Sequence, residues 1–312
     1  MALRVIKPGM LTTIQDAGRW GYQSRGVPVA GPMDSVSLRL ANALVGNARG
    51  AAGLEITLLG PELEFEDERV IAIAGAEFDV TLDGKVVALH APFIVSSGSH
   101  LRFGMRRRGA RAYLAVTGGI ATEAVLGSRA THVISAMGGV DGRPLRAGDA
   151  VPLGPTTHLQ GTAHASAPIV PLPDRGARVR VMPGPQADYF AADALDVLQS
   201  SPYTIGQQSD RMGFRLEGPR LTHARGADVI SGATPLGVLQ VPASGQPILL
   251  MADRQTTGGY PKIATVITAD IPIAGQLGPG DSISFVVCSI AEAMAALIAQ
   301  ERVLMTVESA GS

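Results

Sequence analysis

Short alternating or β-branched runs bounded by Gly, Pro or Asp recur along the chain and predict strands. The clearest runs are residues 69–74, 78–82, 112–116 and 283–287. Asp83 and Gly84 follow one of these runs and precede the apolar run KVVAL. Because both residues tolerate positive φ, they predict a two-residue hairpin turn of type I′. Many short, regularly spaced strands favour a barrel or a sandwich.

Helical periodicity is confined to a few segments. Residues 34–44 begin with Asp34, a good N-cap residue, and carry apolar side chains at Val36, Leu40 and Leu44 before Gly46 can end the helix. Residues 187–198 and 291–304 show a similar period. The pattern as a whole predicts a mainly β protein with a few helices.

The two halves of the chain echo each other. Four short matches occur in the same order: residues 5–9 with 180–184, residues 13–22 with 204–214, residues 59–63 with 217–221, and residues 74–76 with 231–233. This order favours an internal duplication. A stretch rich in prolines and small polar residues at 154–178 is typical of a linker, so we predict a boundary near residue 170 and domains spanning 1–170 and 171–312.

Composition excludes several classes of function. Lys and Arg total 26 against 27 Asp and Glu, so the chain lacks the net positive charge of a nucleic-acid-binding protein. No apolar run reaches the roughly 18 residues that span a bilayer, and Pro8 precedes any signal-peptide core. We therefore expect a cytoplasmic protein with neither nucleic acid nor membrane as partner.

Two further features have ordinary structural interpretations. The single cysteine, Cys288, lies in an apolar run and is predicted to be a buried strand residue. The run of three arginines at 106–108 is predicted to be a solvated turn.

The common signature motifs of catalysis are missing from the sequence. No Walker loop, GxSxG elbow or HExxH motif occurs, and the six histidines include no i, i+4 pair. One cysteine cannot form a CxxC metal site. We predict no metal.

The first candidate binding segment is GVPVAGPMD at residues 26–34. Rigid Gly- and Pro-rich loops present side chains and bare backbone to ligands, so Gly31, Pro32 and Met33 are predicted to contact substrate. Asp34 would cap a helix whose free N–H groups favour an anion. The alternative is a helix cap with no further role.

The second candidate segment is residues 241–261, where seven polar or glycine residues at 253–259 follow the apolar run ILLMA. Arg254 offers a planar fork of donors for a carboxylate, and Gln255 can both donate and accept. The other residues predicted to contact substrate here are Ser244, Thr256, Thr257, Gly258 and Tyr260. A structural turn is the alternative interpretation.

Arg211, beside Asp210, is a third candidate for binding substrate, although an ion pair that holds the fold explains it equally well. Gly31 and Gly245 both follow Val-Pro stretches, which indicates related positions in the two halves. We therefore expect the first two segments to face one cleft.

Three stretches, GVPVAGPMD, SDRMGFRLEGP and VLQVPASGQPILLMADRQTTGGYPKIATV, carry a family resemblance. In them the chain resembles the allophanate hydrolase subunit 2 family, also called the KipA-like or biotin-dependent carboxyltransferase family. The likeness runs from VIKPGMLTTIQDAGRWGY to GPGDSISF, nearly the whole chain. The resemblance implies tandem cyclophilin-like β-barrel domains.

The resemblance also implies a function shared with other subunits. Stand-alone members are similar to the C subunit of ATP-dependent 5-oxoprolinase, which works with a KipI-like partner subunit and a LamB/YcsF-like partner subunit to open 5-oxo-L-proline to L-glutamate. Other members are the carboxyltransferase part of urea carboxylase, where biotin delivers the carboxylate. A KipA-like regulator that binds a KipI-like kinase inhibitor is a third alternative.

Under the oxoprolinase interpretation we expect a lactam hydrolase subunit that is inactive alone. ATP would phosphorylate the lactam oxygen, at a site that can lie outside this chain. The candidate catalytic residues are Asp34, to position or deprotonate water, Arg254, to hold anionic oxygens, and Gln255.

Overall fold

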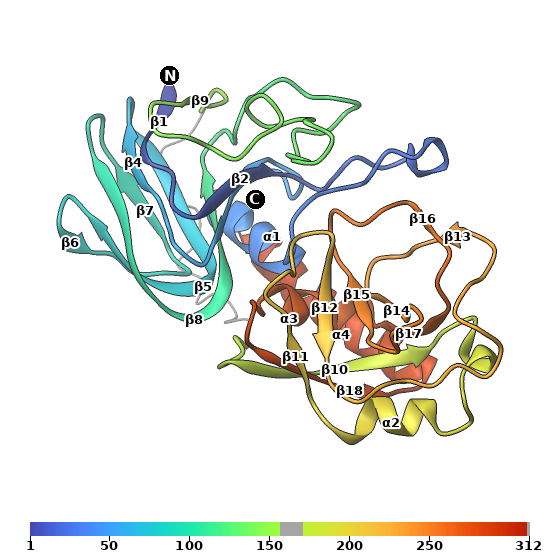
Figure 1. Cartoon of the computed structure of the whole chain (residues 1–312). Helices are drawn as coiled ribbons and strands as arrows, with labels where there is room; N and C mark the ends of the chain where they lie inside the picture. The colour runs from blue at the N-terminus through green and yellow to red at the C-terminus, as the bar shows by residue number, and fades with distance from the viewer. Residues whose placement is uncertain (157–170, 311–312) are drawn as a thin grey trace. The chain divides into compact units, whose positions relative to one another are not determined.

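The computed structural model describes residues 1–156 and 171–310, which form two compact units (Figure 1). Unit 1 comprises residues 1–19, 30–172 and 301–312, and unit 2 comprises residues 20–29 and 173–300. The predicted boundary near residue 170, and most of the predicted linker, lie outside the described residues. Within the described residues, no helix has the length and apolar character needed to cross a membrane.

Unit 1 is built on a sheet that has nine strands among the described residues. The strands are β1 (Ala2–Lys7), β2 (Leu11–Gln15), β3 (Gly53–Thr57), β4 (Glu62–Phe65), β5 (Arg69–Leu82), β6 (Lys85–Val86), β7 (Pro92–Val95), β8 (His100–Val116) and β9 (Ala150–Pro152). They follow the order β2-β3-β8-β4-β1-β9, and β5 pairs with β6, β7 and β8. All of these pairings are antiparallel.

Both faces of the β5–β8 part of this sheet are buried. Ile71 and Ile73 belong to the main core, whereas Val70 and Ala72 on the other face pack in a second cluster with Leu40 of helix α1 (Ser35–Leu44). A strand covered on both faces has no solvent side to alternate with, so its sequence is continuously apolar. This explains the run RVIAIAGA, in which the alternating pattern is absent.

Unit 2 is a closed β-barrel of strands in the order β10-β17-β14-β15-β12-β11-β18. The barrel strands are β10 (Gly176–Pro183), β11 (Tyr203–Ile205), β12 (Gly213–Glu217), β14 (Val238–Gln240), β15 (Ile248–Leu250), β17 (Lys262–Val266) and β18 (Ser282–Val287). β10 and β18 pair in parallel, and the other pairings are antiparallel. The prediction of a mainly β fold with barrel architecture is confirmed.

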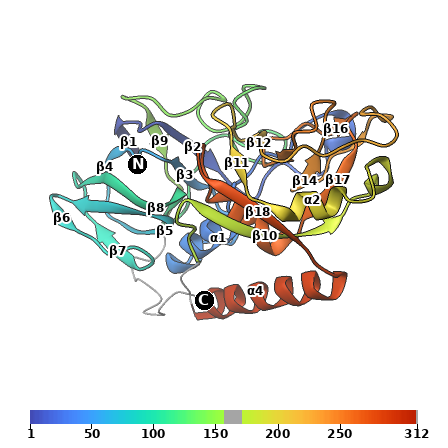
Figure 2. The same cartoon turned by 60° about the horizontal axis from the view of Figure 1, so that its bottom comes forward.

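Shorter elements complete unit 2. They are the two-stranded sheet of β13 (Gly232–Ala233) and β16 (Thr257–Gly258), the 3-10 turns η1 (Gln23–Arg25), η2 (Ala187–Tyr189) and η3 (Thr268–Asp270), and the helices α2 (Ala194–Ser200) and α3 (Ile271–Gly275). Helix α4 (Ile290–Ala310) follows β18 and contributes residues to both units (Figure 2). In unit 1, Arg39 of α1 pairs with Glu301 and Glu308 of α4 at 2.7 and 3.0 Å.

Several predicted elements are confirmed. Helix α1 begins after Asp34, and α4 contains the predicted segment 291–304. The Asp83-Gly84 turn has φ of 49° and 80°, and it joins β5 to β6 with Leu82 opposite Lys85, as a type I′ hairpin requires.

Other predicted elements are wrong in detail. Residues 69–74 and 78–82 form one strand, β5, and residues 187–198 divide into η2 and α2 because Phe190 forms a β-bridge with His223 between them. The arginines at 106–108 lie within β8, not in a turn, and Arg107 pairs with Asp79 at 2.6 Å. Cys288 is half-buried just after β18, outside the strand.

The first two echoes between the halves fall on comparable elements. Residues 5–9 and 180–184 overlap β1 and β10, and residues 13–14 and 204–205 lie in β2 and β11. The later echoes fall on different kinds of element, such as the middle of β5 and the short strand β13. The duplication and its two halves therefore stay a prediction.

Candidate functional site

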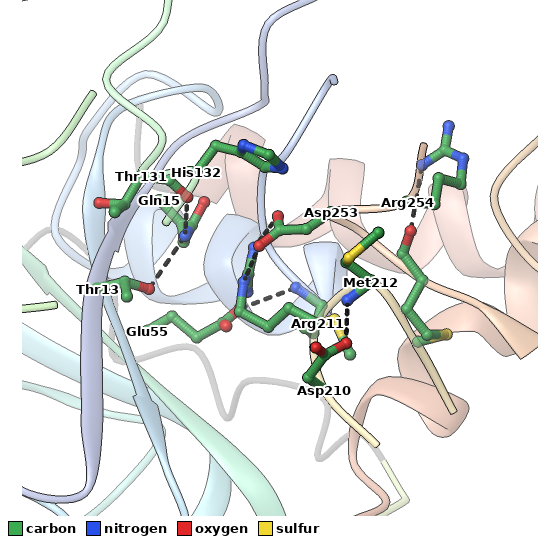
Figure 3. A network of polar contacts seen from close by, with 12 residues as sticks. Thr13, Gln15, Glu55, Thr131, His132, Asp210, Arg211, Met212, Asp253 and Arg254 are labelled. Atoms are coloured by element: carbon green, nitrogen blue, oxygen red, sulfur yellow. Dashed lines mark hydrogen bonds and ion pairs between the residues drawn. The ribbon is translucent and has the colours of Figure 1, made fainter. Parts of the chain in front are cut away.

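Residues 253–259 follow β15 in unit 2 and begin with a buried carboxylate. Asp253 forms a two-point ion pair with Arg211, with Oδ2–Nε and Oδ1–Nη2 distances of 2.9 and 3.0 Å. Both side chains are 6% exposed, and Figure 3 shows them facing each other. Arg211 thus pairs with Asp253, and the Oδ1 of the neighbouring Asp210 accepts hydrogen bonds from the Met212 and Gly213 N–H groups.

Arg254, the next residue, is half-buried and fixed by the backbone. Its Nε donates to the Thr234 carbonyl at 2.8 Å (Figure 3). Burial lowers the pKa of the Arg254 guanidinium, and the charge of Asp253 opposes that shift. An arginine of this kind stays protonated at neutral pH and can present its outer N–H groups to an anion.

Arg254 lines a pocket of about 340 Å³ in unit 2. The lining residues are Trp20, Gln23, Val29, Ala233, Thr234, Pro235, Leu236, Arg254, Gln255 and Thr256. Gln255 is held by its Nε2 donating to Gln240 Oε1 at 3.2 Å. Three of the predicted site residues, Arg254, Gln255 and Thr256, therefore meet at one concave surface.

The other predicted residues of unit 2 lie outside this lining. Thr257 and Gly258 form β16 and pair with β13. Tyr260 is 41% exposed, and Ser244 is exposed in a turn where its Oγ accepts from Gln246 N–H at 3.3 Å. A substrate role for these four residues stays a prediction.

The predicted loop of unit 1 has an unusual backbone. Ala30 and Gly31 both have positive φ, 56° and 86°, and the first of these is costly for a residue other than glycine. The loop delivers Asp34 to the start of α1, where its Oδ1 accepts from Ser37 N–H at 2.9 Å and its Oδ2 accepts from Ser37 Oγ at 2.6 Å. Asp34 is fully buried, so the predicted helix cap is present.

A buried carboxylate beside this loop was missed by the sequence analysis. Glu55 Oε2 accepts from Met33 N–H at 2.8 Å and from the Tyr113 hydroxyl at 2.7 Å, and that hydroxyl accepts from Asp34 N–H at 2.8 Å. Burial, and then the charge of Glu55, hold the pKa of Tyr113 well above its usual value. Met33 is buried, and Pro32 beside it is half-buried.

The signal for this network was the strand register. Glu55 stands between Leu54 and Ile56, which face the main core, so its side chain takes the opposite face. There the antiparallel register sets Glu55 between Thr13 and Tyr113. The sequence alternation alone does not show that this second face is also buried.

Unit 1 also holds buried polar side-chain atoms that have no hydrogen-bond partner among the described residues. They include Gln15 Oε1, Thr57 Oγ1, Asp67 Oδ1, Thr122 Oγ1, Thr131 Oγ1 and His132 Nε2. A buried polar atom left without a hydrogen bond costs about 1–3 kcal/mol. Such atoms are rare in folded proteins and call for an explanation.

The fold agrees with comparisons to known proteins. A family model described as carboxyltransferase domain, subdomain A and B, matches residues 25–287. The chain belongs to this family. The family resemblance found in the sequence motifs is confirmed.

Among curated relatives of this carboxyltransferase family member, the C subunit of Escherichia coli 5-oxoprolinase is 39% identical over 300 residues, covering 96% of each chain. The protein of the same name from Haemophilus influenzae is 37% identical over 281 residues, covering 90% of this chain and 89% of its own. The crystal structure of Kluyveromyces lactis urea carboxylase is similar, with a TM-score of 0.91 and 33% identity, over 98% of this chain but 29% of that one.

Gly31, Pro32, Met33 and Asp34 belong to unit 1, whereas Arg211, Arg254 and Gln255 belong to unit 2. The common cleft expected for the two loops stays a prediction. No group of three or more His, Cys, Asp or Glu side chains suited to a metal occurs in the described part of the chain.

Proposed function

We propose that this chain is the C subunit of an ATP-dependent 5-oxoprolinase and that it acts with partner subunits to open 5-oxo-L-proline to L-glutamate. The observation that carries the proposal is the end-to-end match to proteins of that name, 96% of both chains for the Escherichia coli relative. In this reaction the ring C–N bond breaks, the carbonyl carbon bonds to a water oxygen, and the nitrogen takes a proton.

The pocket of unit 2 suits part of this substrate. The Arg254 guanidinium is anchored at Nε by the Thr234 carbonyl and at Nη1 by the Met251 carbonyl, and its Nη2 is the group proposed to bind a carboxylate such as that of 5-oxo-L-proline. Gln255 and Thr256 line the same pocket and add neutral donors and acceptors. In this proposal Arg254 orients the substrate.

The same pocket does not suit a nucleoside triphosphate. Among the residues that line it, Arg254 is the one cationic side chain. Several cations or backbone N–H groups usually share a triphosphate charge. We therefore propose that this pocket does not hold ATP, whose site in the assembled complex can lie outside this chain.

The partners in this proposal are a KipI-like subunit and a LamB/YcsF-like subunit, with the chain inactive alone in the cytoplasm. Asp34 is proposed to position the attacking water in addition to capping α1. Its two oxygens already accept hydrogen bonds from Ser37, so this second role is tested separately below.

Growth on 5-oxo-L-proline as the nitrogen source tests the proposal. A bacterium lacking its own C subunit should grow when given this chain together with the two partner subunits. Arg254→Ala should lower turnover of the assembled complex about 30-fold, because a hydrogen bond to a charged group is lost. Arg225→Ala, which removes an exposed arginine paired with Asp188, is the matched control and should leave growth unchanged.

The similarity to urea carboxylase supports one alternative function, a carboxyltransferase that receives its carboxylate from biotin. That alternative predicts biotin-dependent consumption of urea in place of glutamate formation. A chain that binds the KipI-like protein without any substrate-dependent turnover would instead be a regulator.

A further inference from the structure

The pocket of about 340 Å³ in unit 2 carries an uncompensated charge. Arg254 is the one cationic side chain among the described residues that line it, and none of those residues is Asp or Glu. The other lining residues are neutral or apolar. The lining therefore offers a positive charge with no negative charge beside it.

The groups next to Arg254 leave part of its guanidinium available. The neighbouring Asp253 pairs through both carboxylate oxygens with Arg211, at 2.9 and 3.0 Å. Arg254 Nε and Nη1 donate to the carbonyls of Thr234 and Met251, which carry no net charge. Among the described residues Nη2 has no hydrogen-bond partner, and it is not one of the buried unpartnered atoms, so it is open to a ligand.

Apolar side chains form another part of the lining. They include Trp20, which is 61% exposed, and Val29, which is buried. An indole ring offers a flat surface against which a flat ligand ring can pack. An ammonium group would lose water in such a place without gaining a carboxylate partner, which is unfavourable.

We propose that this pocket selects carboxylates whose neighbouring nitrogen carries no charge. Arg254 Nη2 binds the carboxylate, and an ammonium group on the same small ligand would lie near the guanidinium, where like charges repel. A lactam nitrogen is neutral, whereas the nitrogen of an amino acid is protonated at neutral pH. The identity of the lactam as 5-oxo-L-proline rests on the proposed function, but the charge preference does not.

The preference has a consequence for product release. Opening the ring of 5-oxo-L-proline turns its neutral amide nitrogen into the ammonium group of L-glutamate. The reaction therefore converts a ligand that the pocket accepts into one that it rejects. We expect L-glutamate to be a poor inhibitor of the assembled complex.

Cyclopentanecarboxylate and L-proline test the preference, because both have a five-membered ring and a carboxylate and only L-proline has an ammonium group. Trp20 is the single tryptophan of the chain, so its fluorescence reports on this pocket in the full-length chain. We expect 5-oxo-L-proline and cyclopentanecarboxylate to change the emission saturably and L-proline to bind at least tenfold more weakly. Equal binding of L-proline and cyclopentanecarboxylate would overturn the proposal.

Three variants place the ligand in the pocket. Arg254→Ala should abolish the response to cyclopentanecarboxylate, whereas Arg225→Ala, at an exposed pair with Asp188, should leave it unchanged. Gln255→Glu adds a carboxylate of nearly the same shape to the lining and should bring L-proline to within about twofold of cyclopentanecarboxylate. Thermal melting checks that each variant is folded. A response that survives in folded Arg254→Ala, or an unchanged preference in folded Gln255→Glu, would contradict the assignment.

Inhibition of the assembled complex separates this proposal from the proposed function. Cyclopentanecarboxylate should compete with 5-oxo-L-proline, and L-proline and L-glutamate should not compete at ten times its concentration. Turnover of 5-oxo-L-proline that cyclopentanecarboxylate does not inhibit would overturn the pocket assignment and leave the function standing. Selective binding of cyclopentanecarboxylate over L-proline, in a complex that forms no glutamate, would support the pocket and count against the function.

Discussion

At the residue scale, the buried ion pair of Arg211 and Asp253 should matter more to stability than any exposed pair. Removing one partner leaves the other charge buried, which costs about 3 kcal/mol. We expect Arg211→Met to lower the free energy of unfolding by about that amount in urea denaturation. Arg225→Met, at a pair that is 62% and 58% exposed, should cost below about 1 kcal/mol. Equal effects of the two substitutions would contradict this assignment.

Tyr203 should make stability fall at high pH. Burial raises the pKa of this phenol to about 12, and its hydroxyl donates to the Pro219 carbonyl. Below pH 10 the phenol is protonated in both states, and its contribution is fully present. As pH rises from about 10 to 12, the unfolded chain ionises first, so the unfolding free energy should fall by about 2 kcal/mol. Tyr203→Phe should reduce that fall, and a variant with the wild-type slope would contradict the prediction.

At the scale of elements, the cap of α1 can be separated from any catalytic role of Asp34. Asp34→Ala removes the acceptor for Ser37 N–H and should cost about 1 kcal/mol of unfolding free energy. Asp34→Ser and Asp34→Asn keep a capping oxygen and should recover most of it. Thermal and urea unfolding of the three variants check this order.

The same variants test the proposed role of Asp34 in positioning water. Asn can cap the helix but cannot take a proton from water, so Asp34→Asn should keep the stability and lose most of the turnover. A stable Asp34→Asn complex with full activity would leave Asp34 as a helix cap alone.

The sequence predicted well those elements that depend on a few adjacent residues. The Asp34 cap and the Asp83-Gly84 turn depend on a few adjacent residues, and both are present. Contacts between distant residues were beyond such reasoning. Arg211 pairs with Asp253, a residue 42 positions away in the sequence.

The candidate site was predicted in the same uneven way. The pocket residues Arg254, Gln255 and Thr256 could be predicted, because a polar run that follows a buried strand is a local sequence pattern. Glu55 and Tyr113 become partners only through the register of β3 and β8, and the unsatisfied atoms of Gln15 and His132 depend on packing from residues 15 to 132. Sequence patterns do not contain that packing.

At the scale of the whole molecule, the chain joins a nine-stranded sheet unit to a closed barrel unit, and each contributes polar groups without obvious catalytic power of their own. In the proposed function, Arg254 holds the carboxylate of the substrate. A chain with binding groups and no nucleophile motif fits the role of one subunit in a larger enzyme.

The most direct test of this account is glutamate formation by purified subunits. The account predicts that this chain, the two partner subunits and ATP together convert 5-oxo-L-proline to L-glutamate, and that omitting this chain abolishes the reaction. Equal glutamate formation without this chain, or consumption of urea in place of 5-oxo-L-proline when biotin and bicarbonate are supplied, would contradict it.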